Sequence, residues 1–138
     1  MMQVGELGEF ALIARLQRSL QGPLGPRVVQ GIGDDCAVVR AAPGTELLLT
    51  VDTQEESVHF RREWSTPQDI GWRCLAVNVS DIAAMAGMPL GALVALSLPQ
   101  ALDVAFVDAL YEGMRALAHD YDCPIIGGNI SKAPESLT

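Results

Sequence analysis

The sequence predicts an α/β (α+β) domain in which helices pack on one side of a mixed β-sheet. Segments of helical length alternate along the chain with short runs of β-branched and other apolar residues. Prolines and glycines separate these segments, as is typical of turns between helices and strands. A length of 138 residues and a hydrophobic fraction of 49% are sufficient for one domain with its own core, over residues 1–138.

Three helices are predicted from apolar spacing and from residues typical of helix ends. Apolar side chains at near-helical intervals predict a first helix over residues 6–20, which the Gly-Pro pair at 22–23 ends. A proline in the first helical position follows Thr66 as an N-cap, so a second helix is expected over residues 67–86. Apolar positions at helical spacing predict a third helix over residues 101–121.

The strands are predicted from short β-branched and apolar runs bounded by turn residues. Residues 36–40 and 46–51 are expected to form an antiparallel pair, because an Ala-Pro-Gly turn separates them. Residues 58–60 are expected to be a short extended piece. Buried strands are expected over residues 90–98 and 123–126, and the second of these runs into a Gly-Gly pair.

Charge and composition exclude several classes of protein. Lys and Arg number 9 against 17 Asp and Glu, and the net charge of -8 disfavours binding to a nucleic-acid backbone. Glycines and prolines interrupt the uncharged stretch over residues 82–102, so a helix end, a turn and a strand explain it better than a membrane span. The N-terminus shows no secretory pattern, and we expect a cytoplasmic location. The widely spaced Cys36, Cys74 and Cys123 are expected to be buried apolar residues in a reducing compartment.

Acidic residues at the ends of predicted strands are the candidates for chemistry. Asp34-Asp35 follow a Gly-Ile-Gly sequence, Asp52 ends a predicted strand, and Asp81 lies in an otherwise apolar helix. A divalent cation would satisfy several such carboxylates at once, and Mg²⁺ combines a few carboxylates with phosphates and water. Other interpretations stay open: a solvated turn for the aspartate pair, a loop cap for Asp52, and a helix face shared with Asn78 for Asp81.

Several segments, in order along the chain, resemble the bacterial thiamine-monophosphate kinase family, within the superfamily of aminoimidazole-ribonucleotide synthetase. They are GEFALIA at residues 8–14, GIGDDCA at residues 31–37, Asp52 followed by His59-Phe60, LAVNVSDIAAM at residues 75–85, and Ile126-Gly127-Gly128. The resemblance covers nearly the whole chain. It implies that residues 1–138 form the N-terminal ATP- and metal-binding and dimerisation domain, and that the family's C-terminal domain is absent.

The resemblance implies transfer of the ATP γ-phosphoryl group to thiamine monophosphate, giving thiamine diphosphate, with Mg²⁺ between the two polyanions. In this family the N-terminal domains pair around a two-fold axis, so a homodimer built on residues 46–51 and 90–98 is expected. The C-terminal domain supplies further contacts, so this chain alone is expected to be inactive. Two other functions stay open: another ATP-dependent enzyme of the same superfamily, and a non-catalytic dimerising or ligand-binding module.

The resemblance also implies a set of metal ligands. Asp35, Thr50, Asp52 and Asp81 are expected to hold Mg²⁺, and the backbone carbonyl of Val51 is a further expected ligand. All of these are oxygen donors, the kind that Mg²⁺ prefers.

Three more residues are implied at the substrates. His59 is expected to contact thiamine monophosphate, although a single histidine taken alone is more often an ordinary surface or core residue. Gly128 and Asn129 are expected to lie at the nucleotide. Asn129 stands where the family has aspartate, so it offers an oxygen without a charge and one metal position is expected to be weaker.

Overall fold

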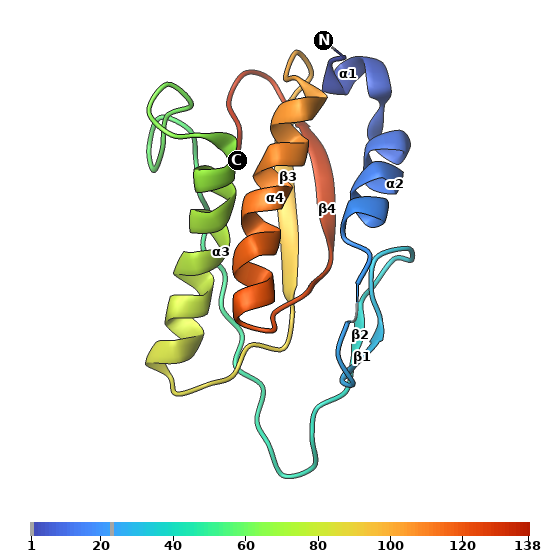
Figure 1. The fold of residues 1–138 in the computed structure, drawn as a ribbon, viewed down its shortest axis with the longest axis vertical. Helices are drawn as coiled ribbons and strands as arrows, with labels where there is room; N and C mark the ends of the chain where they lie inside the picture. Colours follow the sequence, from blue (N-terminus) through green and yellow to red (C-terminus); the bar gives the residue numbers. More distant parts are fainter. Residues whose placement is uncertain (1, 23) are drawn as a thin grey trace.

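Helices and short strands alternate in the computed structural model, which describes residues 2–22 and 24–138 (Figure 1). Their order is α1, α2, β1, β2, α3, β3, α4, β4. The expected α+β class is confirmed. Pro23 of the predicted helix-ending pair lies outside the described residues. Among the helices of the described ranges, none combines the length and apolar character that a bilayer crossing requires.

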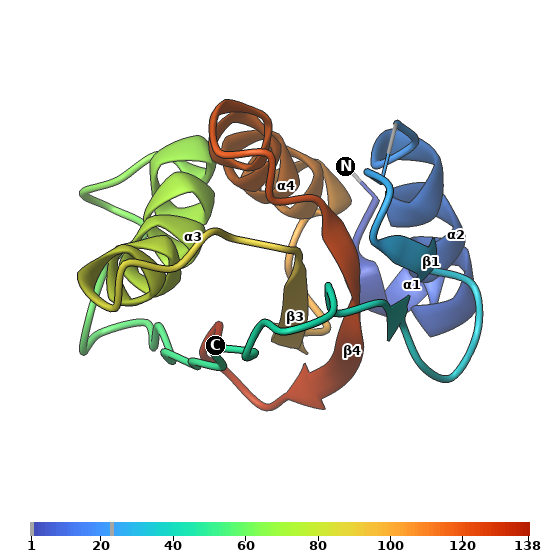
Figure 2. The ribbon, with the colours of Figure 1, turned by 90° about the horizontal axis from the view of Figure 1, so that it is seen from below.

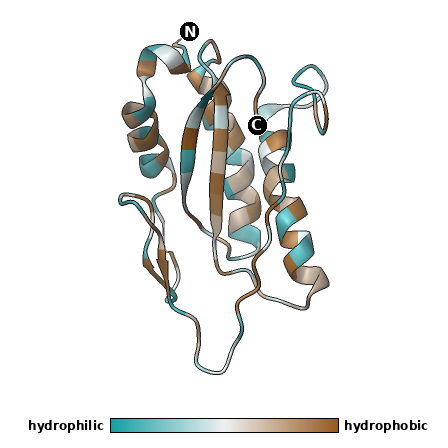
Figure 3. Cartoon of the chain, turned by 180° about the vertical axis from the view of Figure 1, so that it is seen from behind, coloured by the Kyte–Doolittle hydropathy of each residue, from teal (hydrophilic) through white to brown (hydrophobic). Residues whose placement is uncertain are grey.

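A parallel pair of strands forms the centre of the fold. Strand β3 (Ala92–Pro99) pairs with β4 (Ile125–Ala133), and α4 (Val104–Asp120) makes the crossover that a parallel pair requires. Seen from below, α3 and α4 lie over one face of this sheet (Figure 2). The view from behind shows the opposite face with no helix over it (Figure 3). The helices therefore cover one side, as predicted.

The core lies between this sheet and the helices. Leu96 and Leu98 of β3 point into it, whereas Leu93 lies on the open side and is 68% exposed. Helix α4 contributes Val107, and α2 (Glu9–Ser19) contributes Leu12, both fully buried. The period of two along β3 thus separates a core face from an open face.

Helix α3 (Pro67–Ala84) crosses α4 at two glycines. The predicted N-cap is confirmed, because the Thr66 hydroxyl accepts a hydrogen bond from the Asp69 amide at 3.1 Å. A Cβ on Gly71 would lie 1.9 Å from the carbonyl oxygen of Leu110, and a Cβ on Gly113 would lie 1.9 Å from that of Gln68. The two backbones therefore pack directly against each other, which fixes the position of α3 on α4.

The first predicted helix is two helices. Helix α1 (Val4–Leu7) ends at Gly8, and α2 begins at Glu9. Gly8 has φ 78°, a left-handed conformation that breaks the helix and that glycine adopts without a steric penalty. The apolar spacing over residues 6–20 predicted the helical character correctly but not this break.

The expected antiparallel pair of residues 36–40 and 46–51 is wrong. Strand β2 (Val38–Val39) pairs instead with β1 (Val28–Gln30) in a separate antiparallel sheet. Residues 46–51 have no strand partner, and their side chains are exposed. A polar contact with α3 holds the end of this segment instead. The four strands form two small sheets, β1–β2 and β3–β4, rather than one mixed sheet.

Four smaller predictions differ from the structure. Residues 58–60 end a turn instead of an extended piece, because Ser57 takes a left-handed φ of 71°. Cys36 is exposed rather than buried. The strand expected over residues 123–126 begins at Ile125 and continues past the two glycines. The third helix begins later than expected, at Val104, because the carboxylate of Asp103 caps it.

Candidate functional site

Three of the expected metal ligands meet where residues 50–52 cross α3. The Thr50 hydroxyl donates a hydrogen bond to Oδ2 of Asp81 at 2.8 Å, and the Asp52 amide donates to Oδ1 of Asn78 at 2.9 Å. Asn78 and Asp81 are three residues apart on α3, so they share one helix face. We call Thr50, Asp52, Asn78 and Asp81 the acidic cluster.

Asn78 is the member of this cluster to which the sequence assigned no role. Its side-chain amide donates to the Cys74 carbonyl at 2.9 Å, which orients its oxygen towards the Asp52 amide. The three-residue spacing between Asn78 and Asp81 was visible in the sequence, but it indicated only that the two side chains share a helix face. Asn78 holds the backbone at Asp52 against the helix.

The acidic cluster suits a hard cation in its chemistry. Its side chains offer carboxylate, hydroxyl and amide oxygens, and Asp52 and Asp81 are exposed. In the part of the chain that the structure describes, neither carboxylate forms a salt bridge. Two uncompensated carboxylates beside further oxygen donors are a donor set that Mg²⁺ accepts. Val51 lies between Thr50 and Asp52 in the sequence, and its side chain is exposed.

Asp35 lies in a different place. Its turn packs against the start of β4, since a Cβ on Gly127 would lie 3.7 Å from the Cβ of Ala37. Oδ1 of Asp34 accepts the Asp35 amide at 2.9 Å, and this bond, with a second from Gln30, lowers the pKa of Asp34. Within residues 2–22 and 24–138, no three His, Cys, Asp or Glu side chains gather closely enough to hold one metal ion. The structure thus unites Thr50, Asp52 and Asp81 without Asp35.

The two residues expected at the nucleotide lie in β4. Gly128 pairs in register with Val94, and Asn129 pairs with Ala95. Gly128 has φ 148°, and a Cβ there would lie 2.0 Å from the Val94 carbonyl oxygen, so only glycine fits. Asn129 is exposed, which leaves its side chain accessible to a ligand.

His59 lies in the turn before α3, and its side chain is exposed. Its ring Nδ1 accepts a hydrogen bond from the Glu55 amide at 3.0 Å. Its backbone carbonyl accepts a hydrogen bond from Arg73 of α3 at 2.7 Å. The same helix therefore carries contacts to both the acidic cluster and the His59 turn.

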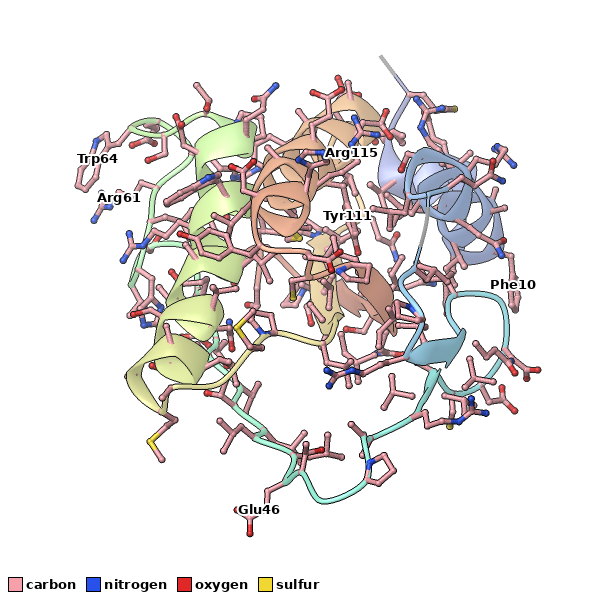
Figure 4. The ribbon with its side chains drawn as sticks, turned by 60° about the horizontal axis from the view of Figure 1, so that its bottom comes forward. Phe10, Glu46, Arg61, Trp64, Tyr111 and Arg115 are labelled. Carbon is pink, nitrogen blue, oxygen red and sulfur yellow. The ribbon has the colours of Figure 1, made fainter. Side chains whose placement is uncertain are left out.

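A hollow of about 400 Å³ lies between α2 and α4 and shares no residue with the acidic cluster. Arg15 makes two hydrogen bonds with the carboxylate of Asp108, at 2.7 and 2.6 Å, and Arg115 donates to the Ser19 carbonyl at 2.8 Å. Burial raises the pKa of Tyr111, beside Arg115 on α4, to about 12 (Figure 4). Most of the charges here are satisfied within the chain, so this hollow leaves few free charged groups for a ligand.

The chain is similar to known proteins over nearly its whole length. The thiamine-monophosphate kinase of Aquifex aeolicus is 41% identical over 132 residues, which cover 96% of this chain and 40% of that protein. A solved structure described as AaThiL complexed with AMPPCP and TMP is 40% identical, with a TM-score of 0.66, over 99% of this chain and 41% of that one. The thiamine-monophosphate kinase of Stenotrophomonas maltophilia has a TM-score of 0.72 and 39% identity, over 94% and 40% of the two chains.

The chain thus spans well under half the length of these relatives. Residues 33–138 match the family described as AIR synthase related protein, N-terminal domain. This match includes the acidic cluster, the His59 turn and strand β4. The chain belongs to the AIR synthase related family through its N-terminal domain, and the relatives described above are thiamine-monophosphate kinases.

Proposed function

We propose that this chain is the N-terminal part of a cytoplasmic, ATP-dependent kinase that converts thiamine monophosphate to thiamine diphosphate. The observation that carries the proposal is the acidic cluster, in which Thr50 and Asp52 meet α3 at Asn78 and Asp81. The similarity to thiamine-monophosphate kinases over nearly the whole chain supports the choice of substrate. The cysteines, all three free, agree with a reducing compartment.

The residues of this chain would divide the work of binding. Asp52 and Asp81, with the Thr50 hydroxyl and the Val51 carbonyl, would hold Mg²⁺, which lowers the repulsion between two phosphate groups. Asp35, which lies apart from the acidic cluster in its turn beside β4, stays a proposed metal ligand on the family resemblance alone. Gly128 and Asn129 would contact the nucleotide, since both are exposed on β4. No side-chain nucleophile is needed, because positioning and charge neutralisation supply most of the catalysis in such transfers.

His59 provides the test of the substrate. In a calorimetric titration with thiamine monophosphate and Mg²⁺, we expect His59→Ala to weaken binding at least about tenfold, equivalent to roughly 1.4 kcal/mol. We expect this loss of affinity because the substitution removes the exposed, hydrogen-bonding imidazole ring that we propose to contact thiamine monophosphate. His119→Ala is the matched control, since the only other histidine lies exposed in the last turn of α4. Equal affinities for the two variants, or no binding by the unmodified chain, would contradict this role.

We also infer that two copies of the chain form a homodimer. Leu49 and Val51 of the unpaired segment are 92% and 87% exposed, and Leu93 projects from the open face of the β3–β4 sheet. Unpaired extended backbone beside exposed apolar side chains is a surface that another chain usually covers. A second copy is the occupant that the family resemblance favours.

The dimer is tested by sedimentation velocity over a range of concentrations. We expect the unmodified chain to sediment as a dimer and Leu49→Asp to shift it to a monomer, because a buried charge in the interface has no partner. Glu46→Ala is the control, since Glu46 projects from the far end of the same segment (Figure 4). A monomer at all concentrations of the unmodified chain excludes the homodimer.

A further inference from the structure

The turn over residues 55–60 is tightly closed by its own backbone. The His59 amide donates to the Glu55 carbonyl at 2.8 Å, and the Ser57 amide donates to the Phe60 carbonyl at 2.7 Å. Phe60 is only 8% exposed and anchors one end of the turn in the core. Glu56 bonds to Arg62 and to the Leu137 amide, which ties the other side to the C-terminal segment. The backbone that carries His59 is therefore restrained on both sides.

The His59 ring is fixed within this turn by one further bond. Its Nδ1 accepts the Glu55 amide hydrogen at 3.0 Å, so Nδ1 carries no proton. In a neutral imidazole the proton is then on Nε2, on the opposite side of the ring. The exposed ring thus presents an N–H donor away from the turn. A donor of this kind matches a phosphate oxygen, which is an acceptor.

Arg73 is the group that joins this turn to α3. Its Nη1 donates to the His59 backbone carbonyl at 2.7 Å, a charge-assisted bond that is stronger than one between neutral groups. Across the described ranges Arg73 forms no salt bridge, so this carbonyl is its principal polar contact. Asn78 and Asp81 follow on the same helix. One rigid element therefore holds both the His59 turn and the acidic cluster.

We propose that Arg73 is a positioning residue for His59: it holds the turn so that the neutral ring presents Nε2–H as a donor to the phosphate group of a phosphorylated substrate. The phosphate partner rests on the proposed function, whereas the state of the ring does not. Without Arg73 the His59 carbonyl would bond to water, and the turn would lose its connection to α3. The ring would then sample both neutral forms.

Nitrogen NMR of the two histidine side chains tests this directly in the absence of any ligand. In the ¹⁵N-histidine-labelled chain above the titration range of the rings, we expect His59 to show one protonated nitrogen, Nε2, and one unprotonated nitrogen, Nδ1. His119 is an internal comparison, because its exposed Nδ1 lies 3.6 Å from the Asp120 carboxylate and accepts no amide hydrogen in the described structure. Averaged His59 shifts that resemble those of His119 would overturn the assignment.

Three variants then separate positioning from general stability. We expect Arg73→Ala to shift the His59 signals to the averaged values of His119, and Arg73→Lys to restore the single form, because lysine keeps a charged donor. Arg61→Ala is the matched control, because this arginine stacks on Trp64, 4.8 Å from the ring centre, and it is Arg73 that donates to the His59 carbonyl (Figure 4). Unchanged His59 signals in Arg73→Ala would overturn the proposal.

Adding thiamine monophosphate with Mg²⁺ tests the substrate separately. We expect the Nε2 signal of His59 to shift in the unmodified chain and in Arg73→Lys, and at least about tenfold more substrate to be needed in Arg73→Ala. A fixed ring that does not respond to the substrate would contradict the phosphate role while leaving the ring assignment intact. The failure of the proposed function is thereby distinguished from the failure of the positioning role.

Discussion

Gly113→Ala is expected to destabilise the chain by about 3 kcal/mol or more. The new Cβ would lie 1.9 Å from the Gln68 carbonyl oxygen, and its next neighbours are also backbone atoms of that residue. Backbone cannot move aside as a flexible side chain can, so α3 and α4 must separate. Separation of these helices would expose the core side chains packed between them.

Urea unfolding followed by circular dichroism measures this change. Gly22→Ala is the control, because a Cβ on Gly22 would meet nothing within 4 Å, and we expect its free energy of unfolding to change little. Gly71→Ala should resemble Gly113→Ala, since its Cβ would approach the Leu110 carbonyl equally closely. A Gly113→Ala protein as stable as the Gly22→Ala control would show that the two helices do not cross in this way.

Asp81→Asn has the largest effect expected on binding. Asparagine keeps an oxygen that accepts the Thr50 hydroxyl, so the fold is preserved, but it removes one of the two charges in the acidic cluster. We expect the Mg²⁺-dependent affinity for AMPPCP, an ATP analogue, to fall at least about tenfold in calorimetry.

Glu135→Gln is the matched control for Asp81→Asn. It removes the same charge from an exposed position outside the acidic cluster, so it reports the effect of net charge alone. Equal losses of affinity in the two variants would attribute the effect to net charge and not to a metal ligand at Asp81. A loss in Asp81→Asn alone supports the ligand role.

The elements that cover and form the parallel sheet could be predicted because their signals are local. Thr66 as N-cap defines the start of α3, and proline and glycine bound the apolar run that becomes β3. Strand pairing could not be predicted in the same way. Residues 46–51 have the composition of a strand, but only tertiary contacts show that they remain unpaired while residues 28–30 pair with β2.

The candidate site was predictable in its residues and less so in its geometry. The acidic residues were visible in the sequence, and the resemblance of the chain to a kinase family suggested that these residues bind the same cation. Their spacing could not show that Thr50 reaches Asp81 or that Asn78 holds the Asp52 backbone, because these contacts join residues far apart in the chain. Nor could it show that Asp35 lies beside β4, apart from the acidic cluster.

We propose above all that this chain carries a metal-dependent nucleotide site. Calorimetric titration of the unmodified chain with AMPPCP, in the presence and absence of Mg²⁺, tests it most directly. We expect binding that requires Mg²⁺, through Asp52, Asp81 and the residues around them. Equal binding without Mg²⁺, or no binding with it, would rule out a metal-dependent nucleotide site in this chain and favour a non-catalytic dimerising module.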